Sequence, residues 1–190
     1  MNEAEQFAED YLKRRVLRPK RFSKQEMRLT KTPDFRVFNG AVLVAYCEAK
    51  HVQEDDRLEK QLVDTPIGAI VGGVRQDPIF NRISNHIHEA AQQFSAVNPD
   101  RVCPNILVFA NSDTHSDARD LDSVLTGLFR VKGGADEPIY KQYSEGRIQK
   151  EKHLIDLYIW WDTWKDAERY SRYFAAESPH KDKLKTMLPR

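Results

Sequence analysis

Cysteine is scarce in this sequence, and long apolar runs are missing from it. The 190 residues include 2 cysteines, Cys47 and Cys103, and neither belongs to a CxxC pair or a Cys/His metal-ligand spacing. We therefore expect two buried, reduced thiols. No apolar run approaches the ~20 residues that a bilayer-spanning helix needs. Residues 1–10 are acidic and helical in pattern, and they lack the apolar core of a signal peptide. These absences predict a cytoplasmic protein without a membrane segment.

The chain as a whole also lacks an excess of either charge. The 30 Lys and Arg residues nearly balance the 29 Asp and Glu residues, which leaves a formal net charge of +1. The total charge therefore does not indicate a polyanionic partner, and local clusters have to be examined instead.

Basic residues gather between positions 13 and 24. Such a cluster can neutralise phosphates, which supply most of the sequence-independent affinity for nucleic acid. The alternative is a solvated helix end followed by a loop. A basic tail at 178–190, which we expect to be loose, is weaker evidence for the same partner. The residues of the cluster that we expect to bind nucleic acid are Arg14, Arg15, Arg18, Lys20 and Arg21.

The composition suits a single globular domain. Charged residues make up 31% of the chain and hydrophobic residues 40%, with no internal repeat and no clear linker. At this length a core can form without covalent staples. We therefore expect one domain over residues 1–190.

Hydrophobic periodicity and turn signals divide the chain into helices and strands. Residues 105–110 form a nearly continuous apolar run, typical of a strand buried on both faces. Residues 54–63 are helix-permissive, whereas 65–75 and 131–152 resemble loops. The pattern predicts helices at 2–16, 77–97, 120–129 and 162–174, and strands at 26–30, 35–38, 41–47, 105–110 and 154–161. This order predicts an α/β fold with a mixed central sheet flanked by helices on both faces.

Aromatic residues are concentrated near the C-terminal end. Packing in the core explains such a cluster most simply; a dimer interface is a second interpretation and base stacking a third. The cluster comprises Tyr158, Trp160, Trp161, Trp164, Tyr170, Tyr173 and Phe174.

The most informative stretch is the expected hairpin of residues 35–47 and its two ends. Asp34 opens the first strand, and the second strand ends in Glu48-Ala49-Lys50. Strand side chains alternate, so Glu48 and Lys50 point to the same side. Two carboxylates and an ammonium can therefore converge at one end of the hairpin.

This combination suits a hard divalent cation and a phosphate. Mg²⁺ prefers oxygen ligands, and Asp34 and Glu48 can supply two, with the backbone carbonyl of Ala49 as a third. Such a metal polarises a phosphate oxygen and acidifies a bound water. Lys50 would stand beside that water, where it can orient it, help to deprotonate it or stabilise negative charge on the phosphate.

Pro33, Asp34, Glu48 and Lys50 together resemble the motif of the PD-(D/E)xK phosphodiesterase superfamily. The expected order of elements over residues 4–110 is also similar to the restriction-endonuclease-like core of that family. The resemblance implies that the two carboxylates bind Mg²⁺ or Mn²⁺ and that the lysine assists attack on a nucleic-acid phosphodiester. It therefore predicts a metal-dependent endonuclease, with DNA as the favoured substrate. A homodimer is compatible with this activity, because two active sites would cut both strands of a duplex.

The register of the hairpin tests this interpretation. A strict two-residue turn at Asn39-Gly40 would place Asp34 opposite Ala45, on the face away from Glu48. A three-residue turn or one β-bulge would place Asp34 opposite Tyr46, with Glu48 as a diagonal neighbour on the same face. We therefore predict an irregularity in this hairpin, between residues 35 and 47.

The family resemblance also implies supporting residues. A residue of the leading helix often joins the site, and Glu5 and Glu9 lie four apart on one helix face, with Glu9 preferred because it precedes the basic segment. A glutamine after the ExK strand approaches the site in some branches, and Gln61, Gln92 and Gln93 are the candidates. Two alternatives to a nuclease stay open: a non-catalytic nucleic-acid-binding or assembly module of the same fold, and an unrelated α/β interaction protein.

Overall fold

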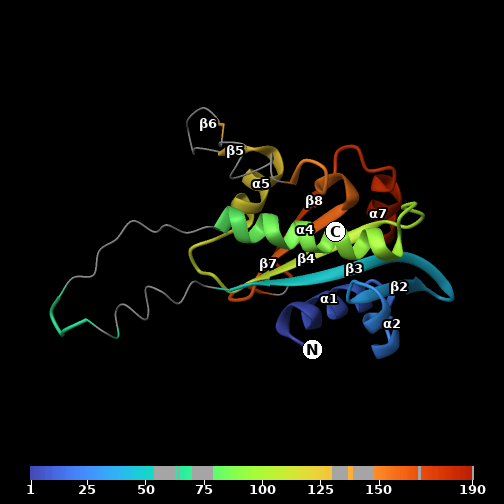
Figure 1. The fold of residues 1–190 in the computed structure, drawn as a ribbon, viewed down its shortest axis with the longest axis horizontal. Helices are drawn as coiled ribbons and strands as arrows, with labels where there is room; N and C mark the ends of the chain where they lie inside the picture. The colour runs from blue at the N-terminus through green and yellow to red at the C-terminus, as the bar shows by residue number, and fades with distance from the viewer. Residues whose placement is uncertain are drawn as a thin grey trace.

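The computed structural model describes residues 1–53, 63, 65–69, 79–129, 137–138, 148–166 and 168–189 (Figure 1). The main helices are α1 (Glu3–Lys13), α2 (Lys24–Leu29), α4 (Ile79–Val97), α5 (Ala118–Thr126) and α7 (Lys181–Met187), with a short 3-10 helix η2 (Lys152–Leu154). The strands are β1 (Arg18–Arg21), β2 (Phe35–Asn39), β3 (Val42–Val52), β4 (Asn105–Asn111), β5 (Leu128–Phe129), β6 (Glu137–Pro138), β7 (Leu157–Asp162) and β8 (Tyr170–Phe174). Most of the stretches at 54–63, 65–75 and 131–152 lies outside the described residues, as does the start of the helix predicted at 77.

A six-stranded mixed sheet forms the centre of the molecule, in the order β1-β2-β3-β4-β7-β8. Strands β3, β4 and β7 run parallel to one another. Strands β1 and β2 continue the sheet antiparallel on one side, and β8 does so on the other. All residues of β4 are buried, as expected for a strand covered on both faces. The predicted α/β fold with a mixed sheet is therefore confirmed.

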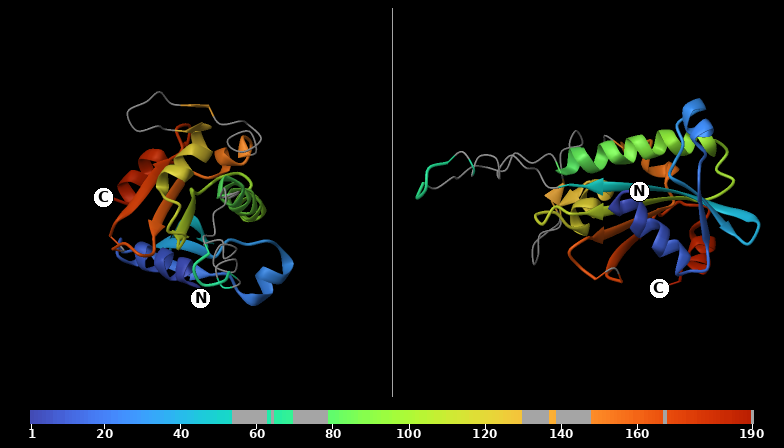
Figure 2. Two further views of the ribbon diagram at one scale, coloured as in Figure 1. Left: turned by 90° about the vertical axis from the view of Figure 1, so that its left-hand side faces the viewer. Right: turned by 90° about the horizontal axis from the view of Figure 1, so that it is seen from below.

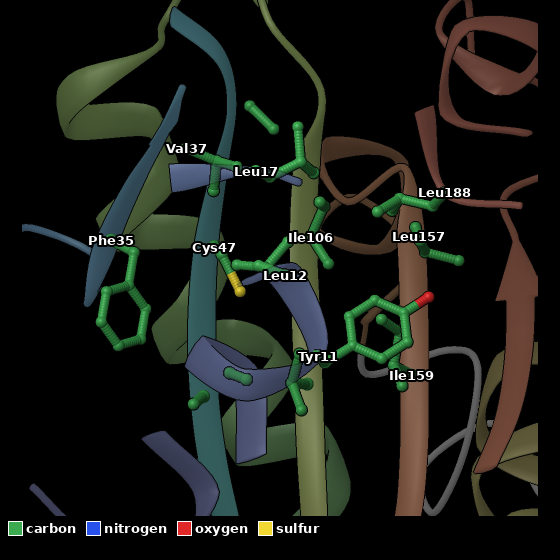
Figure 3. Packing of buried hydrophobic residues seen from close by; sticks show 14 of the residues in the cluster. Tyr11, Leu12, Leu17, Phe35, Val37, Cys47, Ile106, Leu157, Ile159 and Leu188 are labelled. Carbon is green, nitrogen blue, oxygen red and sulfur yellow. The ribbon is translucent and has the colours of Figure 1, made fainter. Parts of the chain in front are cut away.

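Helices cover both faces of this sheet (Figures 1 and 2). On one face, Phe7 and Leu12 of α1 and Leu184 of α7 pack on Cys47 and Ile106, and Figure 3 shows much of this cluster. On the other face, α4 and α5 cover the alternate residues of the strands. Helix α4 confirms the helix predicted at this part of the chain, and its apolar stripe of Ile83, Ile87, Ala90, Ala91 and Phe94 is buried.

The aromatic residues mostly pack in or against the core, in agreement with the simplest interpretation: Tyr158 and Trp160 are buried, and four others are half-buried against it. Trp160 is 1% exposed, and Trp161 stacks on Phe7 with ring centroids 4.3 Å apart. Trp164 is the exception, with 44% of its surface exposed. Both cysteines are buried and free. Among the described residues, no helix has the length and apolarity that a membrane crossing requires.

Three predicted elements are wrong, and the helix predicted at 120–129 ends at Thr126, because Gly127 terminates it in a left-handed conformation and Leu128–Phe129 form β5. Residues 26–30 were predicted to form a strand, but they belong to α2 and the turn that follows it. Ser23 caps α2 by accepting from the Glu26 N–H, and the Glu26 carboxylate accepts from the Ser23 N–H. This reciprocal capping satisfies two backbone donors that a helix start leaves unpaired. No side chain of α2 is buried, so no packing against the sheet favours a strand here.

The two other errors concern the C-terminal region. The helix predicted from Asp162 through Phe174 is instead a turn followed by β8, which pairs with the open edge of β7. The tail predicted to be loose contains α7, in which Leu184 is 0% exposed; Leu188, the residue that follows the helix, is 0% exposed as well. Both leucines pack in the cluster between α1 and the sheet.

Candidate active site

An irregularity in the β2–β3 hairpin places the predicted site residues on one face. The strands turn at Gly40-Ala41, since Asn39 pairs with Val42, and the register shifts between Val37 and Phe38. Gly40 has a φ of 59°, a left-handed value that glycine adopts without strain. The predicted irregularity is confirmed, although the turn lies one residue further on. The register then pairs Phe35 with Cys47, so its continuation sets Asp34 opposite Glu48 rather than opposite Tyr46.

Asp34 and Glu48 are joined by two reciprocal hydrogen bonds. The backbone N–H of Asp34 donates to Oε2 of Glu48 over 2.9 Å. The backbone N–H of Ala49 donates to Oδ2 of Asp34, also over 2.9 Å. Each carboxyl group is thus oriented through one oxygen, and the second oxygen of Glu48 contacts Lys50. In an extended strand the N–H and C=O of one residue point to the same edge, so the Ala49 carbonyl lies on the side of Asp34.

The two carboxyl groups are strongly desolvated. Glu48 is 3% exposed. Its burial, together with the charge of Asp34, raises the pKa of Glu48 to about 7. Burial raises the pKa of Asp34 as well, against the hydrogen bond from Ala49. A cation bound beside these two buried acids would stabilise their ionised forms.

Lys50 supplies one such cation. Its Nζ lies 3.0 Å from Oε1 of Glu48 and 3.0 Å from Oε2 of Glu89 on α4. Burial alone would lower the pKa of Lys50, but the attraction of Glu48 and Glu89 outweighs it and the pKa is raised. Lys50 is therefore an ammonium at neutral pH, which favours stabilisation of negative charge over removal of a proton from water.

Helix α4 contributes a second wall to the site. Gln93 donates from Nε2 to the Thr32 carbonyl over 2.9 Å, and its side chain also lowers the pKa of Glu48 by hydrogen bonding. Gln92 instead accepts from Lys31, and Gln61 lies outside the described residues. Beside the site is a cavity of about 340 Å³, lined by Met27, Thr30, Lys31, Thr32, Lys50, Glu89 and Gln93.

Sequence reasoning missed Glu89 and His86. Glu89 lies four residues before Gln93, so helical spacing places the two side by side. The sequence alone does not show which face of α4 lies over β3, and Glu89 could therefore not be assigned to the site. Burial, followed by the charge of Lys50, lowers the pKa of His86 to about 4. His86 is therefore neutral at physiological pH.

The leading helix presents a different acid from the one predicted. The carboxylate of Glu9 lies 2.5 Å from Lys13, on the same helix. Glu5 lies near enough to Asp34 to raise the pKa of that residue, and its Oε2 is 2.5 Å from Arg21. Glu5 is thus the acid of α1 that interacts with the site in the described structure.

The predicted basic cluster divides into two groups. Arg15 and Arg21 are tied down: Arg15 contacts the Tyr170 hydroxyl and covers the Tyr11 ring, and Arg21 pairs with Glu5. Arg14, Arg18 and Lys20 are exposed, although Arg18 also donates to the Gly40 carbonyl over 3.4 Å. The positive charges of these three side chains therefore face solvent.

The donor set can be compared with the needs of a divalent cation. In the described part of the chain, no group of three or more His, Cys, Asp or Glu side chains is arranged to hold a metal ion. The pair Asp34 and Glu48 offers two hard oxygen ligands, with the Ala49 carbonyl nearby. Mg²⁺ is commonly held by one or two carboxylates, with waters completing its shell. The residues present therefore fit Mg²⁺ or Mn²⁺ better than zinc.

Comparison with known proteins adds no relative. No protein-family model matches the chain, and no curated protein or solved structure matches it.

Proposed function

We propose that this protein is a Mg²⁺- or Mn²⁺-dependent nuclease that hydrolyses phosphodiester bonds, with DNA as the favoured substrate. The observation that carries the proposal is the meeting of Asp34, Glu48 and Lys50 on one side of a bulged hairpin. Bulges are over-represented next to active sites, where they re-aim a side chain or end strand pairing. Here it brings Asp34 opposite Glu48.

Each residue has a role that follows from its surroundings. Asp34 and Glu48 would hold the cation, since both are oriented by backbone N–H groups and both are poorly solvated. A bound Mg²⁺ polarises a phosphate oxygen and makes a bound water more acidic. Lys50, as an ammonium, would orient the attacking water and stabilise the negative charge that grows on the phosphate. Gln93 would keep the Glu48 carboxylate in place.

The architecture around these residues supports the same proposal. A leading helix, a bulged hairpin, a covering helix and a buried parallel strand follow one another as α1, β2–β3, α4 and β4. We therefore extend the proposal to a restriction-endonuclease-like core for this part of the chain.

Two measurements test the proposed function. Calorimetric titration with Mn²⁺ should give binding to the native protein and none to Asp34→Ala, with Glu168→Ala as a surface control. Plasmid and single-stranded DNA should be cut in Mg²⁺ or Mn²⁺ but not in EDTA, and Lys50→Ala should abolish cutting. Cutting in EDTA, or full activity of Lys50→Ala, would refute the mechanism. Nucleic-acid binding without any cutting would instead favour a non-catalytic binding module.

A further inference from the structure

Helix α2 stands apart from the rest of the molecule. Figure 2 shows it projecting from the body in both views. None of its residues is buried, and Met27 and Leu29 are 60% and 79% exposed. A six-residue helix that buries nothing contributes little to the core, so its apolar side chains need another explanation.

The base of α2 is nevertheless held firmly. Glu26 closes the capping box with Ser23 and forms an ion pair with Arg36 of β2. The Arg36 guanidinium lies 3.9 Å from the centroid of the Phe22 ring, just before α2. Lys31, just after α2, contacts Gln92 on α4 over 2.5 Å. The helix is thus fixed in orientation while its outer surface stays uncovered.

That surface combines apolar and basic side chains beside the candidate active site. Met27 lines the same cavity as Lys50 and Gln93. The segment 18–31 carries six basic residues and one acidic residue, Glu26, which is already paired with Arg36. Since the whole chain has a net charge of +1, the remaining residues are acidic on balance. Positive charge is therefore concentrated on the segment that contains α2.

We propose that α2 is the element that docks nucleic acid next to the candidate active site. Lys24 and Arg28, both exposed and one helical turn apart, would neutralise neighbouring phosphates of the bound strand. Met27, which lines the cavity, would pack against a base face and unstack one step, as apolar wedges do in minor-groove binding proteins. Leu29, two residues on and therefore on another side of the helix, would add a separate apolar contact. The bound nucleic-acid strand would then pass the cavity that Lys50 lines, with basic and apolar side chains of α2 in contact with it. This inference rests on the proposed function for the choice of nucleic acid as the partner.

Binding measured without cleavage tests the docking separately from the chemistry. Fluorescence anisotropy in EDTA would follow the full-length protein on a labelled DNA duplex, its single strand and an RNA of the same sequence. The double variant Met27→Ala/Leu29→Ala should raise the Kd about tenfold on the preferred substrate. Val102→Ala, which changes a side chain that is 75% exposed but does not line the cavity, should leave the Kd unchanged.

Salt dependence tests the charged side chains. Each phosphate contact contributes about 0.9 to the slope of log Kd against log salt concentration for duplex DNA. Lys24→Ala/Arg28→Ala should therefore reduce that slope by about 1.8, whereas Lys183→Ala/Lys185→Ala on α7 should not change it. A substrate with 2-aminopurine at successive positions should show one unstacked step with the native protein and none with Met27→Ala/Leu29→Ala.

The outcomes separate the two proposals. If the native protein cuts DNA but the α2 variants bind and cut like it, docking by α2 is wrong and the nuclease assignment stands. If the native protein binds but does not cut, a weaker Kd for the α2 variants still supports the docking. Loss of a homodimer on sedimentation of Met27→Ala/Leu29→Ala, with the Kd unchanged, would show that α2 contacts a second copy instead. Because α2 buries no side chain, the variants should keep the native unfolding curve.

Discussion

The amine of Lys50 and the carboxylate of Glu89 lie 3.0 Å apart and join the central strand β3 to the helix α4 that covers it. Hydrogen bonding to Lys50 lowers the pKa of Glu89, so the pair is ionised at neutral pH. Glu89 and Glu48 therefore both contact the ammonium, one from the helix and one from the strand. We infer that Glu89 is a positioning residue for Lys50.

Replacing Glu89 should slow cleavage without weakening substrate binding. A hydrogen bond to a charged group contributes about 1.5–3 kcal/mol, and a tenfold change in rate corresponds to about 1.4 kcal/mol. We expect Glu89→Ala to lower kcat about tenfold with little change in KM. Glu89→Gln should recover part of the loss, because its amide oxygen can still accept from Lys50. Steady-state cleavage assays measure kcat and KM for each variant, with Glu168→Ala as control. Equal rates for all variants would contradict the positioning role.

Glu48 should make the stability of the metal-free protein depend on pH. Burial and the charge of Asp34 raise its pKa from 4.5 to about 7. Between these values the folded state keeps a proton that the unfolded state has released, so the free energy of unfolding falls as pH rises through this window. The total effect is at most about 3 kcal/mol.

The variant Glu48→Gln isolates this effect, since its amide does not titrate. Urea unfolding in EDTA at several pH values should show Glu48→Gln gaining stability relative to the native protein from about pH 4.5 to 7. The difference should then stay constant at higher pH. The variant Glu177→Gln, at an exposed position, is the control. Parallel curves for Glu48→Gln and the native protein would show that Glu48 ionises normally.

The two acids of α1 can be compared directly. Glu5 raises the pKa of Asp34 and pairs with Arg21, whereas Glu9 pairs with Lys13 on its own helix. We expect Glu5→Gln to alter Mn²⁺ affinity and cleavage several-fold, and Glu9→Gln to leave both near native values. Calorimetry and plasmid cleavage measure the two quantities. The reverse ranking would restore Glu9 as the supporting acid.

The C-terminal helix should be needed for stability. Leu184 is 0% exposed and packs in the cluster that contains α1 and the sheet. Truncation of a buried leucine to alanine typically costs about 2–5 kcal/mol. Leu184→Ala should lower the free energy of unfolding by that amount in urea titrations. Lys183→Ala, at an exposed position of the same helix, should change it little. An unaffected Leu184→Ala variant would mean that α7 detaches in solution.

The parts of the fold that were predicted correctly carry strong local signals. Helix α4 has an apolar stripe that only a helix places on one face, and β4 is apolar throughout. The hairpin irregularity followed from a parity argument: Asp34 and Glu48 share a face only if the register shifts. That argument fixed the face, but it placed Asp34 opposite Tyr46, because neither the position of the turn nor the position of the bulge could be read from the residues.

The errors arose where a distant partner decides the structure. Residues 170–174 follow a stretch that is compatible with a helix, so the sequence favoured a continued helix. They form a strand because they pair with the open edge of β7. Leu184 lies among charged residues, so its burial depends on a sheet face assembled from remote strands. Helix α2 is different, since Ser23 and Glu26 form a capping box that could have been recognised in the sequence. Glu89 could not have been assigned, because its role depends on how α4 lies over β3.

The absence of buried side chains in α2 has a consequence for how this protein can change. Mutations on its outer surface carry almost no folding penalty, whereas the strand that bears Glu48 and Lys50 is locked between neighbours on both sides. Under the proposed function, the residues that carry out the reaction and the residues that select the nucleic acid would then evolve independently. New preferences could be selected, or engineered by exchanging this short helix, on a scaffold whose reactive centre never has to be rebuilt.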